Sequence, residues 1–139
     1  MSVPLATPSA SAARWLRCLW VALACGCLLS ARVAAADPGP AARGGDVFDE
    51  ECAECHSLRE GKNKKGPSLF AVVGRTAGSA AGYRYSAAMR RAALVWTAEN
   101  IDAYIHAPGK RVPGTRMKYD GLDDAQARAD LIAFLQTLH

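Results

Sequence analysis

The chain has 139 residues, with 17 Lys and Arg against 13 Asp and Glu and a formal net charge of +4. This length allows at most one small domain. Three of the basic residues precede residue 37, so the remainder carries 14 basic and 13 acidic side chains. A nearly neutral domain lacks the bulk charge that drives phosphate binding, which argues against a nucleic-acid-binding function.

The N-terminal segment has the features of an export signal. Two arginines precede an apolar run, residues 18–31, and three alanines ending at Ala36 follow it. This order is typical of a secretory signal peptide, and the run is shorter than the roughly 20 residues of a membrane span. We predict a signal peptide at residues 1–36, cleaved near Ala36 and directing the protein to the periplasm; retention as an anchor is the alternative. A short leader, 37–43, and one domain, 44–139, would follow.

The remaining chain predicts short helices and few strands. Apolar residues recur at intervals of three and four, and turn residues separate these stretches. The predicted helices span residues 44–55, 86–91, 97–107 and 123 to the C-terminus. The expected fold is all-α, with three to five short helices.

Helix boundaries are predicted from capping residues. Asp46 and Asp49 are expected near the positive N-terminal end of the first helix. Asp123 is expected to open the last helix, with Gln126 completing a capping box. Pro108 should stop the third helix, so that a loop follows it.

Cys52-Ala53-Glu54-Cys55-His56 is the most informative stretch of the chain. A Cys-x-x-Cys-His run is the attachment signature of a c-type haem, in which both thiols bind the porphyrin and the histidine binds the iron. A structural turn with incidental cysteines, a redox-active dithiol and a zinc site are the alternatives. A redox dithiol belongs in a βαβ context, and zinc requires four protein ligands. We therefore predict one covalent haem c.

A second motif carries a family resemblance. Pro113-Gly114-Thr115-Arg116-Met117 lies in a predicted loop, with Met117 placed 61 residues after His56. With the haem motif, it resembles the class I cytochromes c, most closely the mitochondrial-type and small bacterial members. The resemblance covers residues 44–138 and implies their fold, packed around one haem, with Met117 and His56 as the two iron ligands.

The resemblance also implies roles for residues around the haem. The Pro67 carbonyl would accept a hydrogen bond from His56, and the Tyr104 hydroxyl would approach the Met117 sulfur. Arg75 would lie near a haem propionate. The remaining implied contacts are made by Tyr85, Ser86 and Trp96, which would hydrogen-bond the propionates, and by Thr115 of the methionine loop.

The chain departs from the family pattern at several positions. Met89 replaces an asparagine of a buried water network. Because the basic residues Arg90 and Arg91 follow it, we expect it to lie in a surface-like run. Tyr119 replaces a phenylalanine beside the exposed haem edge, and Gly109 replaces a lysine that contacts partners. The loop between His56 and Pro67 is one residue shorter than in the mitochondrial proteins.

The predicted function is that of a soluble one-electron carrier, not an enzyme. Its donor would be a respiratory complex or a dehydrogenase, and its acceptor a terminal oxidase or a similar protein. The alternative is a haem protein with an open or labile sixth position that binds gas or peroxide. The expected protein is a monomer without membrane insertion after cleavage. Redox partners would dock at a basic haem edge formed by Lys62, Lys64, Lys65, Lys110, Arg111, Arg116 and Lys118.

Overall fold

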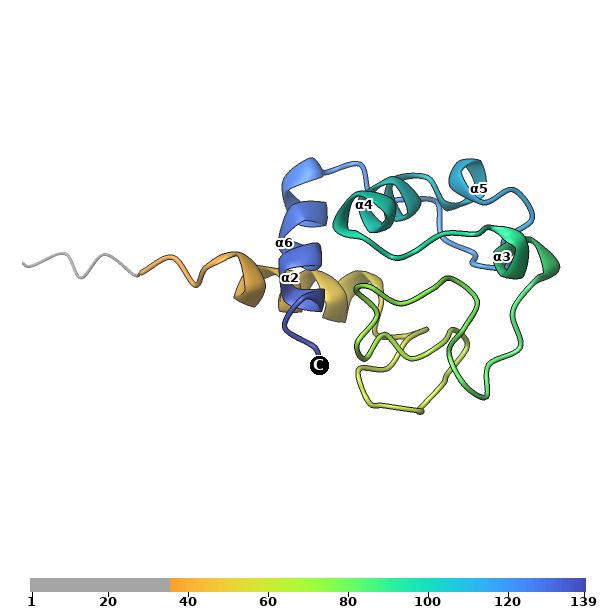
Figure 1. The fold of residues 1–139 in the computed structure, drawn as a ribbon. Helices are drawn as coiled ribbons and strands as arrows, with labels where there is room; N and C mark the ends of the chain where they lie inside the picture. The colour runs from red at the N-terminus through yellow and green to blue at the C-terminus, as the bar shows by residue number, and fades with distance from the viewer. Residues whose placement is uncertain (1–35) are drawn as a thin grey trace, which may run out of the picture. The chain divides into compact units, whose positions relative to one another are not determined.

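A computed structural model describes residues 36–139, so all but the last residue of the predicted signal peptide lies outside the described part. The described residues form short helices joined by long loops (Figure 1). The helices are α2 (Pro40–Glu51), α3 (Ala87–Arg91), α4 (Ala98–His106), α5 (Pro108–Arg111) and α6 (Ala125–Leu135). Within residues 36–139 the β-structure is one isolated bridge, Thr76 to Val95, and the predicted all-α fold is confirmed. None of the helices in this part has the length and apolar character needed to cross a membrane.

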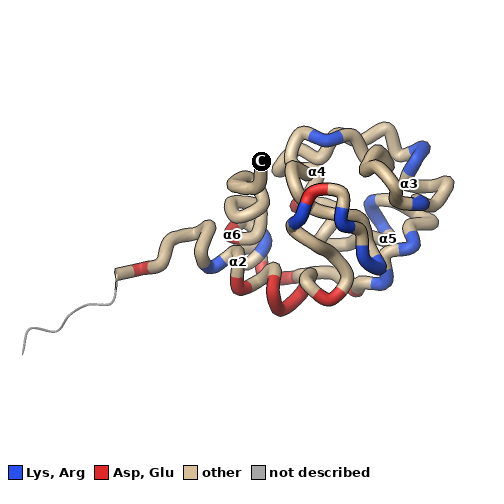
Figure 2. The backbone as a smooth tube through the Cα atoms, turned by 90° about the horizontal axis from the view of Figure 1, so that it is seen from below, with Lys and Arg blue, Asp and Glu red and all other residues tan. Residues whose placement is uncertain are grey.

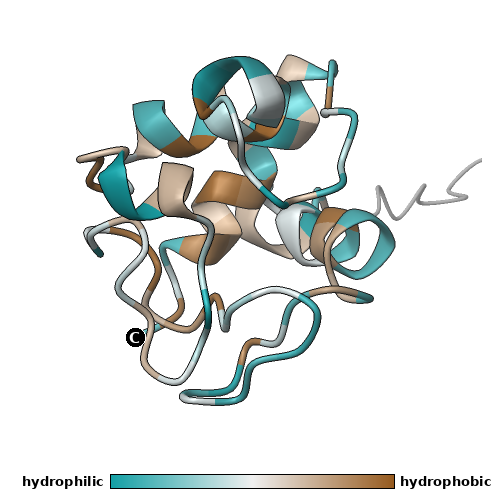
Figure 3. Cartoon of the chain, turned by 90° about the vertical axis from the view of Figure 1, so that its right-hand side faces the viewer, coloured by the Kyte–Doolittle hydropathy of each residue, from teal (hydrophilic) through white to brown (hydrophobic). Residues whose placement is uncertain are grey.

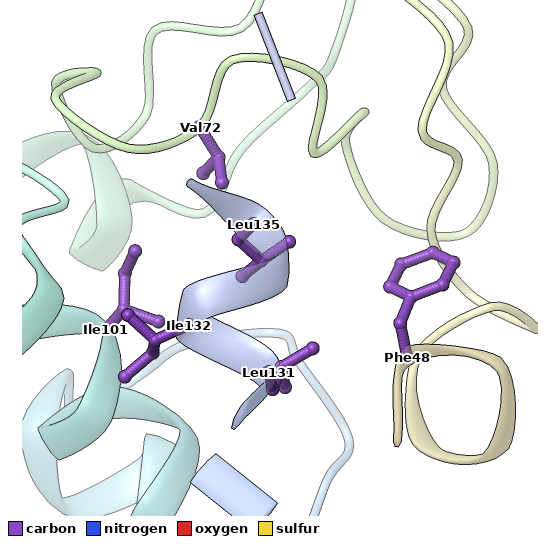
Figure 4. Close-up of a cluster of buried hydrophobic side chains, with 6 residues drawn as sticks. All are labelled: Phe48, Val72, Ile101, Leu131, Ile132 and Leu135. Carbon is purple, nitrogen blue, oxygen red and sulfur yellow. The ribbon is translucent and has the colours of Figure 1, made fainter. Parts of the chain in front are cut away.

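Helices α2 and α6 cross at close range and support the main hydrophobic core (Figure 4). Phe48 of α2 is buried, and its ring lies 5.9 Å from the ring of Phe134 on α6. Leu131 and Leu135 of α6 are buried in the same cluster. Close approach of the two backbones requires a glycine, because a Cβ atom at Gly44 would lie 1.9 Å from the Asp130 carbonyl oxygen.

Helix α2 begins earlier than predicted. It starts at Pro40, within the predicted leader, because the fixed φ of proline suits the first helical position. As a result the first turn contains no acidic residue, and the prediction that Asp46 and Asp49 lie near the N-terminal end was wrong. Instead, Arg43 links this turn to α6, because its Nε donates a hydrogen bond to Asp130 Oδ2 at 2.7 Å.

Helix α6 begins one residue later than predicted. Asp124 is the N-cap, and its carboxylate accepts hydrogen bonds from the Gln126 and Ala127 amides at 2.8 and 3.1 Å. The Gln126 side chain bonds to Asp130 rather than completing a capping box. The helix ends at Leu135, short of the predicted C-terminal end.

The other helices build a second, smaller core. The Thr97 and Ser86 side chains cap α4 and α3, and each accepts a backbone N–H from its own first turn. Pro108 ends α4 as predicted but also starts α5, where a loop was expected, because proline is favoured at the first position of a helix.

Met89 lies in this second core, which corrects its predicted place at the surface. Only 7% of its surface is exposed, and it packs with Tyr104 and Val112. Its neighbours Arg90 and Arg91 are exposed, so burial changes from one residue to the next within α3. Figure 3 shows how hydrophobic and hydrophilic residues are distributed over the chain: hydrophobic stretches are concentrated on central helices, and an outer loop is mostly hydrophilic.

Candidate haem site

A cavity of about 330 Å³ lies between the helices and the long loops. Its volume falls within the usual range for ligand sites, roughly 300–1,000 Å³. Every residue predicted from the sequence for the haem site lines it: Cys52, Cys55, His56, Pro67, Arg75, Tyr85, Ser86, Trp96, Tyr104, Thr115 and Met117. Apolar side chains from both cores, among them Leu131 and Leu135, form much of the remaining wall.

The two cysteines lie at and just after the C-terminal end of α2. Cys52 caps the helix, and a tight turn brings the Cys55 and His56 amides to its carbonyl oxygen, at 3.0 and 2.9 Å. Both thiols are free and half-buried. Burial, reinforced by Glu51 and Cys55, raises the pKa of the Cys52 thiol to about 11. The turn therefore presents both sulfurs to the cavity.

The ring of His56 is held in one tautomer. Its Nδ1 lies 2.7 Å from the Pro67 carbonyl oxygen, which can only accept, so Nδ1 carries the proton. The lone pair of Nε2 is then available to a metal. Burial lowers the pKa of this imidazole, which favours the neutral form. Gly66 lies against the ring, since a Cβ atom there would be 2.3 Å from His56 Cε1.

Met117 reaches the cavity from the loop between α5 and α6 and packs against the second core. Its amide bonds to Thr115 Oγ1 at 3.3 Å. The Tyr104 hydroxyl pairs with the same Thr115 oxygen at 2.8 Å, so it bonds to the loop that carries Met117. Its approach to the methionine sulfur stays a prediction. Trp96 lies beside Tyr104, with ring centroids 5.0 Å apart.

Arg75 provides an independent test of whether a haem fits. Its two terminal nitrogens donate to the carbonyls of Phe70 and Ser68, at 3.0 and 2.8 Å. Its Nε is buried and has no hydrogen-bond partner among the described residues. An unsatisfied buried donor is costly, and burial lowers the pKa of this guanidinium. A carboxylate in the cavity would satisfy Nε, and haem carries two such groups. The residues present therefore fit a haem.

Several cavity residues were not singled out from the sequence. Glu51 and Tyr83 line the cavity, and the Tyr83 hydroxyl donates to the Lys65 carbonyl at 2.8 Å. Tyr119, which the sequence placed beside the haem edge, also lines the cavity and donates to Glu51 Oε2 at 2.9 Å. This last pair joins residues 68 positions apart, and no local pattern could have identified it.

Acidic and basic residues lie on different parts of the surface. Figure 2 shows acidic residues gathered along α2 and basic residues around α3, α5 and the neighbouring loops. Two of the predicted docking lysines have local partners: Lys65 pairs with Glu54, and Lys64 Nζ donates to the Ala53 carbonyl.

The helical fold, the Cys-x-x-Cys-His turn and the enclosed cavity define a small helical protein of the c-type haem class. Comparison with known proteins agrees with this. The profile of the cytochrome c family matches residues 41–139, and the chain belongs to that family. It therefore binds one covalent c-type haem and is an electron carrier, as its relatives are.

The match to individual relatives covers nearly the full length of each relative. Cytochrome c2 of Rhodopila globiformis is 48% identical over 103 residues, covering 74% of this chain and 97% of the relative. Cytochrome c of Euglena viridis is 42% identical, covering 72% and 98% respectively. The structure of cytochrome cH from Methylobacterium extorquens matches with a TM-score of 0.67 at 39% identity, covering 71% of this chain and 99% of that one.

Proposed function

We propose that the chain carries one electron at a time, with Cys52 and Cys55 as the thioether attachment points and His56 and Met117 as axial ligands. The observation that supports this most directly is that His56 and Met117 reach one cavity from separate segments, with His56 Nε2 left free. The haem, when bound, supplies an Fe(III)/Fe(II) couple.

The protein's own residues hold this site in a fixed arrangement. The Pro67 carbonyl holds His56 in the binding tautomer, and a ligand ring fixed in this way needs little rearrangement when the charge changes. The bond between Tyr104 and Thr115 fixes the loop that carries Met117. A thioether paired with an imidazole favours the reduced iron and raises the potential. With both axial positions filled, neither oxygen nor peroxide has a free site.

The test of the ligand assignment is the visible spectrum of the ferric and ferrous holoprotein. The far-red charge-transfer band of a Met–Fe(III) bond should be present in the wild type and absent in Met117→Ala. The variant should also bind CO when reduced and have a lower potential. A wild type that lacks the band and binds CO would contradict the assignment and favour the gas- or peroxide-binding alternative.

Partners are proposed to dock at the basic haem edge. Lys110, Arg116 and Lys118 stand around the methionine loop, and each is exposed. Complementary charge accelerates encounter and makes it sensitive to salt. The proposed donors are a quinol-oxidising complex or a dehydrogenase, and the proposed acceptors are a terminal oxidase or a peroxidase. Oxidation by anionic hexacyanoferrate(III) should slow as salt is added and slow further in Lys118→Gln. A cationic oxidant should show the opposite salt dependence, and equal behaviour of the two would contradict the steering.

We propose that the protein is exported to the periplasm and works there as a monomer after cleavage near Ala36. The sequence features of residues 1–36 support this. The expected intact mass after expression in a host with a haem-attachment system is that of residues 37–139 plus one haem. A mass that includes residues 1–36 would favour the anchored alternative.

A further inference from the structure

Tyr119 forms a hydrogen bond between two segments that line the haem cavity. Its hydroxyl donates to Glu51 Oε2 at 2.9 Å, and both residues line the cavity. Glu51 is the last residue of α2 and directly precedes Cys52. Tyr119 lies two residues after Met117. The bond therefore joins the segment proposed to carry one iron ligand to the helix end that carries a haem-binding cysteine.

The surrounding segment depends on side chains for its position. At its ends, the Thr115 amide donates to the Val112 carbonyl and the Leu122 amide to the Ile105 carbonyl. Between them, the described hydrogen bonds all involve a side chain: Met117 N to Thr115 Oγ1, Arg116 to the Arg84 carbonyl, and Tyr119 to Glu51. A segment with so little backbone pairing can open locally while the rest of the fold remains intact.

These restraints differ in what they connect. The bonds of Thr115 and Arg116 hold the loop to the second core and to the loop before α3. Tyr119 alone among these side chains ties it to α2, on the side of the cavity where the cysteines lie. Its acceptor is a carboxylate, which makes the hydrogen bond stronger than one to a neutral group.

We propose that the bond between Tyr119 and Glu51 is a clasp that holds the methionine loop against α2 and limits how readily Met117 leaves the iron. Tyr119 is a positioning residue in this role, since it acts through the loop and contributes no ligand. The inference rests on the proposed function in one respect, namely that Met117 is the sixth ligand. It goes beyond that function by assigning a determinant of ligand exchange to a residue pair that neither attaches the haem nor binds the iron.

The clasp is tested by displacement of Met117 with imidazole in the ferric holoprotein. Imidazole can bind only when the loop opens, so its apparent affinity reports the population of the open state. Loss of the far-red band would be followed during titration of wild type, Tyr119→Phe, Glu51→Ala and the double variant. Tyr119→Phe removes only the hydroxyl, and alanine suits the helical position of Glu51. Ser79→Ala is the control, because it removes an exposed hydroxyl that bonds to the Thr76 carbonyl and does not line the haem cavity.

Each single variant should bind imidazole about fivefold more tightly than the wild type, the effect expected for one partly exposed hydrogen bond to a charged group. The double variant should bind no more tightly than the stronger single variant, because both substitutions break the same bond. Ser79→Ala should differ from the wild type by less than about twofold.

The outcomes separate this inference from the function on which it rests. Affinities equal to the wild type in both single variants, or fully additive effects in the double variant, would overturn the clasp while Met117 remained a ligand. Absence of the far-red band in the wild type would instead overturn the ligand assignment, and the clasp with it. The guanidinium unfolding midpoint serves as a second readout. A change in imidazole affinity that merely follows a loss of global stability would also count against the clasp.

Discussion

Two adjacent glycines in α2 should respond to alanine in opposite directions. A Cβ atom at Gly44 would lie 1.9 Å from the Asp130 carbonyl oxygen and 2.7 Å from Phe134 Cβ. At Gly45 the nearest atom outside the helix is a ring carbon of Phe134 at 3.7 Å, an ordinary contact. Both substitutions gain helix propensity, worth about 1 kcal/mol. Only the Cβ atom at Gly44 would meet backbone atoms, which cannot move away by a change of rotamer.

The size of the Gly44 effect follows from the distances. Carbon atoms in contact normally lie about 3.5–4.0 Å apart, so α2 and α6 would have to separate by roughly 1 Å or more. Overpacking of this kind costs about 3 kcal/mol at the upper end of its usual range. After the gain in helix propensity, Gly44→Ala should lose about 2 kcal/mol, whereas Gly45→Ala should gain about 0.5–1 kcal/mol.

The assay is guanidinium unfolding of the ferric holoprotein, followed by far-ultraviolet circular dichroism. For a domain of this size, 1 kcal/mol corresponds to about 4–8 °C in Tm, so thermal unfolding provides a second measurement. Equal stability of the two variants would refute the reasoning, because it would mean that α2 and α6 do not meet at Gly44. A loss in Gly45→Ala as large as that in Gly44→Ala would do the same.

Two further substitutions test the site and the helix contact. Gly66→Ala places a methyl group 2.3 Å from the His56 ring and should destabilise the holoprotein by roughly 2 kcal/mol with a change in potential. A Cβ atom at Gly109 would have no atom within 4 Å, so Gly109→Ala should leave the potential unchanged and should not lower the stability. The hydrogen bond from Arg43 lowers the pKa of the Asp130 carboxyl. The stability that this pair contributes is therefore complete above the usual aspartate pKa of about 3.9 and is lost as the pH falls through the lower value in the folded protein. Unfolding measured as a function of pH should accordingly show a smaller loss between about pH 4 and 2 in Asp130→Asn, and an unchanged profile would contradict this role.

Much of the fold could be predicted because local chemistry decides it. The Thr97 cap and the apolar spacing of α4 are encoded within a few residues, and the observed helix follows the prediction closely. The start of α2 was misplaced because Pro40 and Gly39 resemble a linker when read alone. The contact that makes this turn part of the fold, Arg43 with Asp130, joins residues 87 positions apart.

The candidate site likewise has one part that a local motif predicts and another part that depends on tertiary packing. The spacing of Cys52, Cys55 and His56 is a local motif, and it was sufficient to predict the cofactor. The environment of Met89 was predicted wrongly because its neighbours in sequence are exposed arginines, whereas its burial depends on Tyr104 and Val112. Residues that meet only through tertiary packing leave no periodic pattern by which they could be found.

The two hydrophobic cores give the two sides of the haem cavity different physical support. The cysteine side follows directly from α2, which is fixed to α6 by close backbone packing and by a buried carboxylate at Asp130. The methionine side is a loop whose position between Thr115 and Leu122 is set by side-chain hydrogen bonds. A substitution at the helix contact therefore acts first on global unfolding, because it disturbs the largest buried surface. A substitution in the loop acts first on local opening, and thus on the proposed bond between Met117 and the iron, because a local opening costs less free energy than unfolding the whole domain.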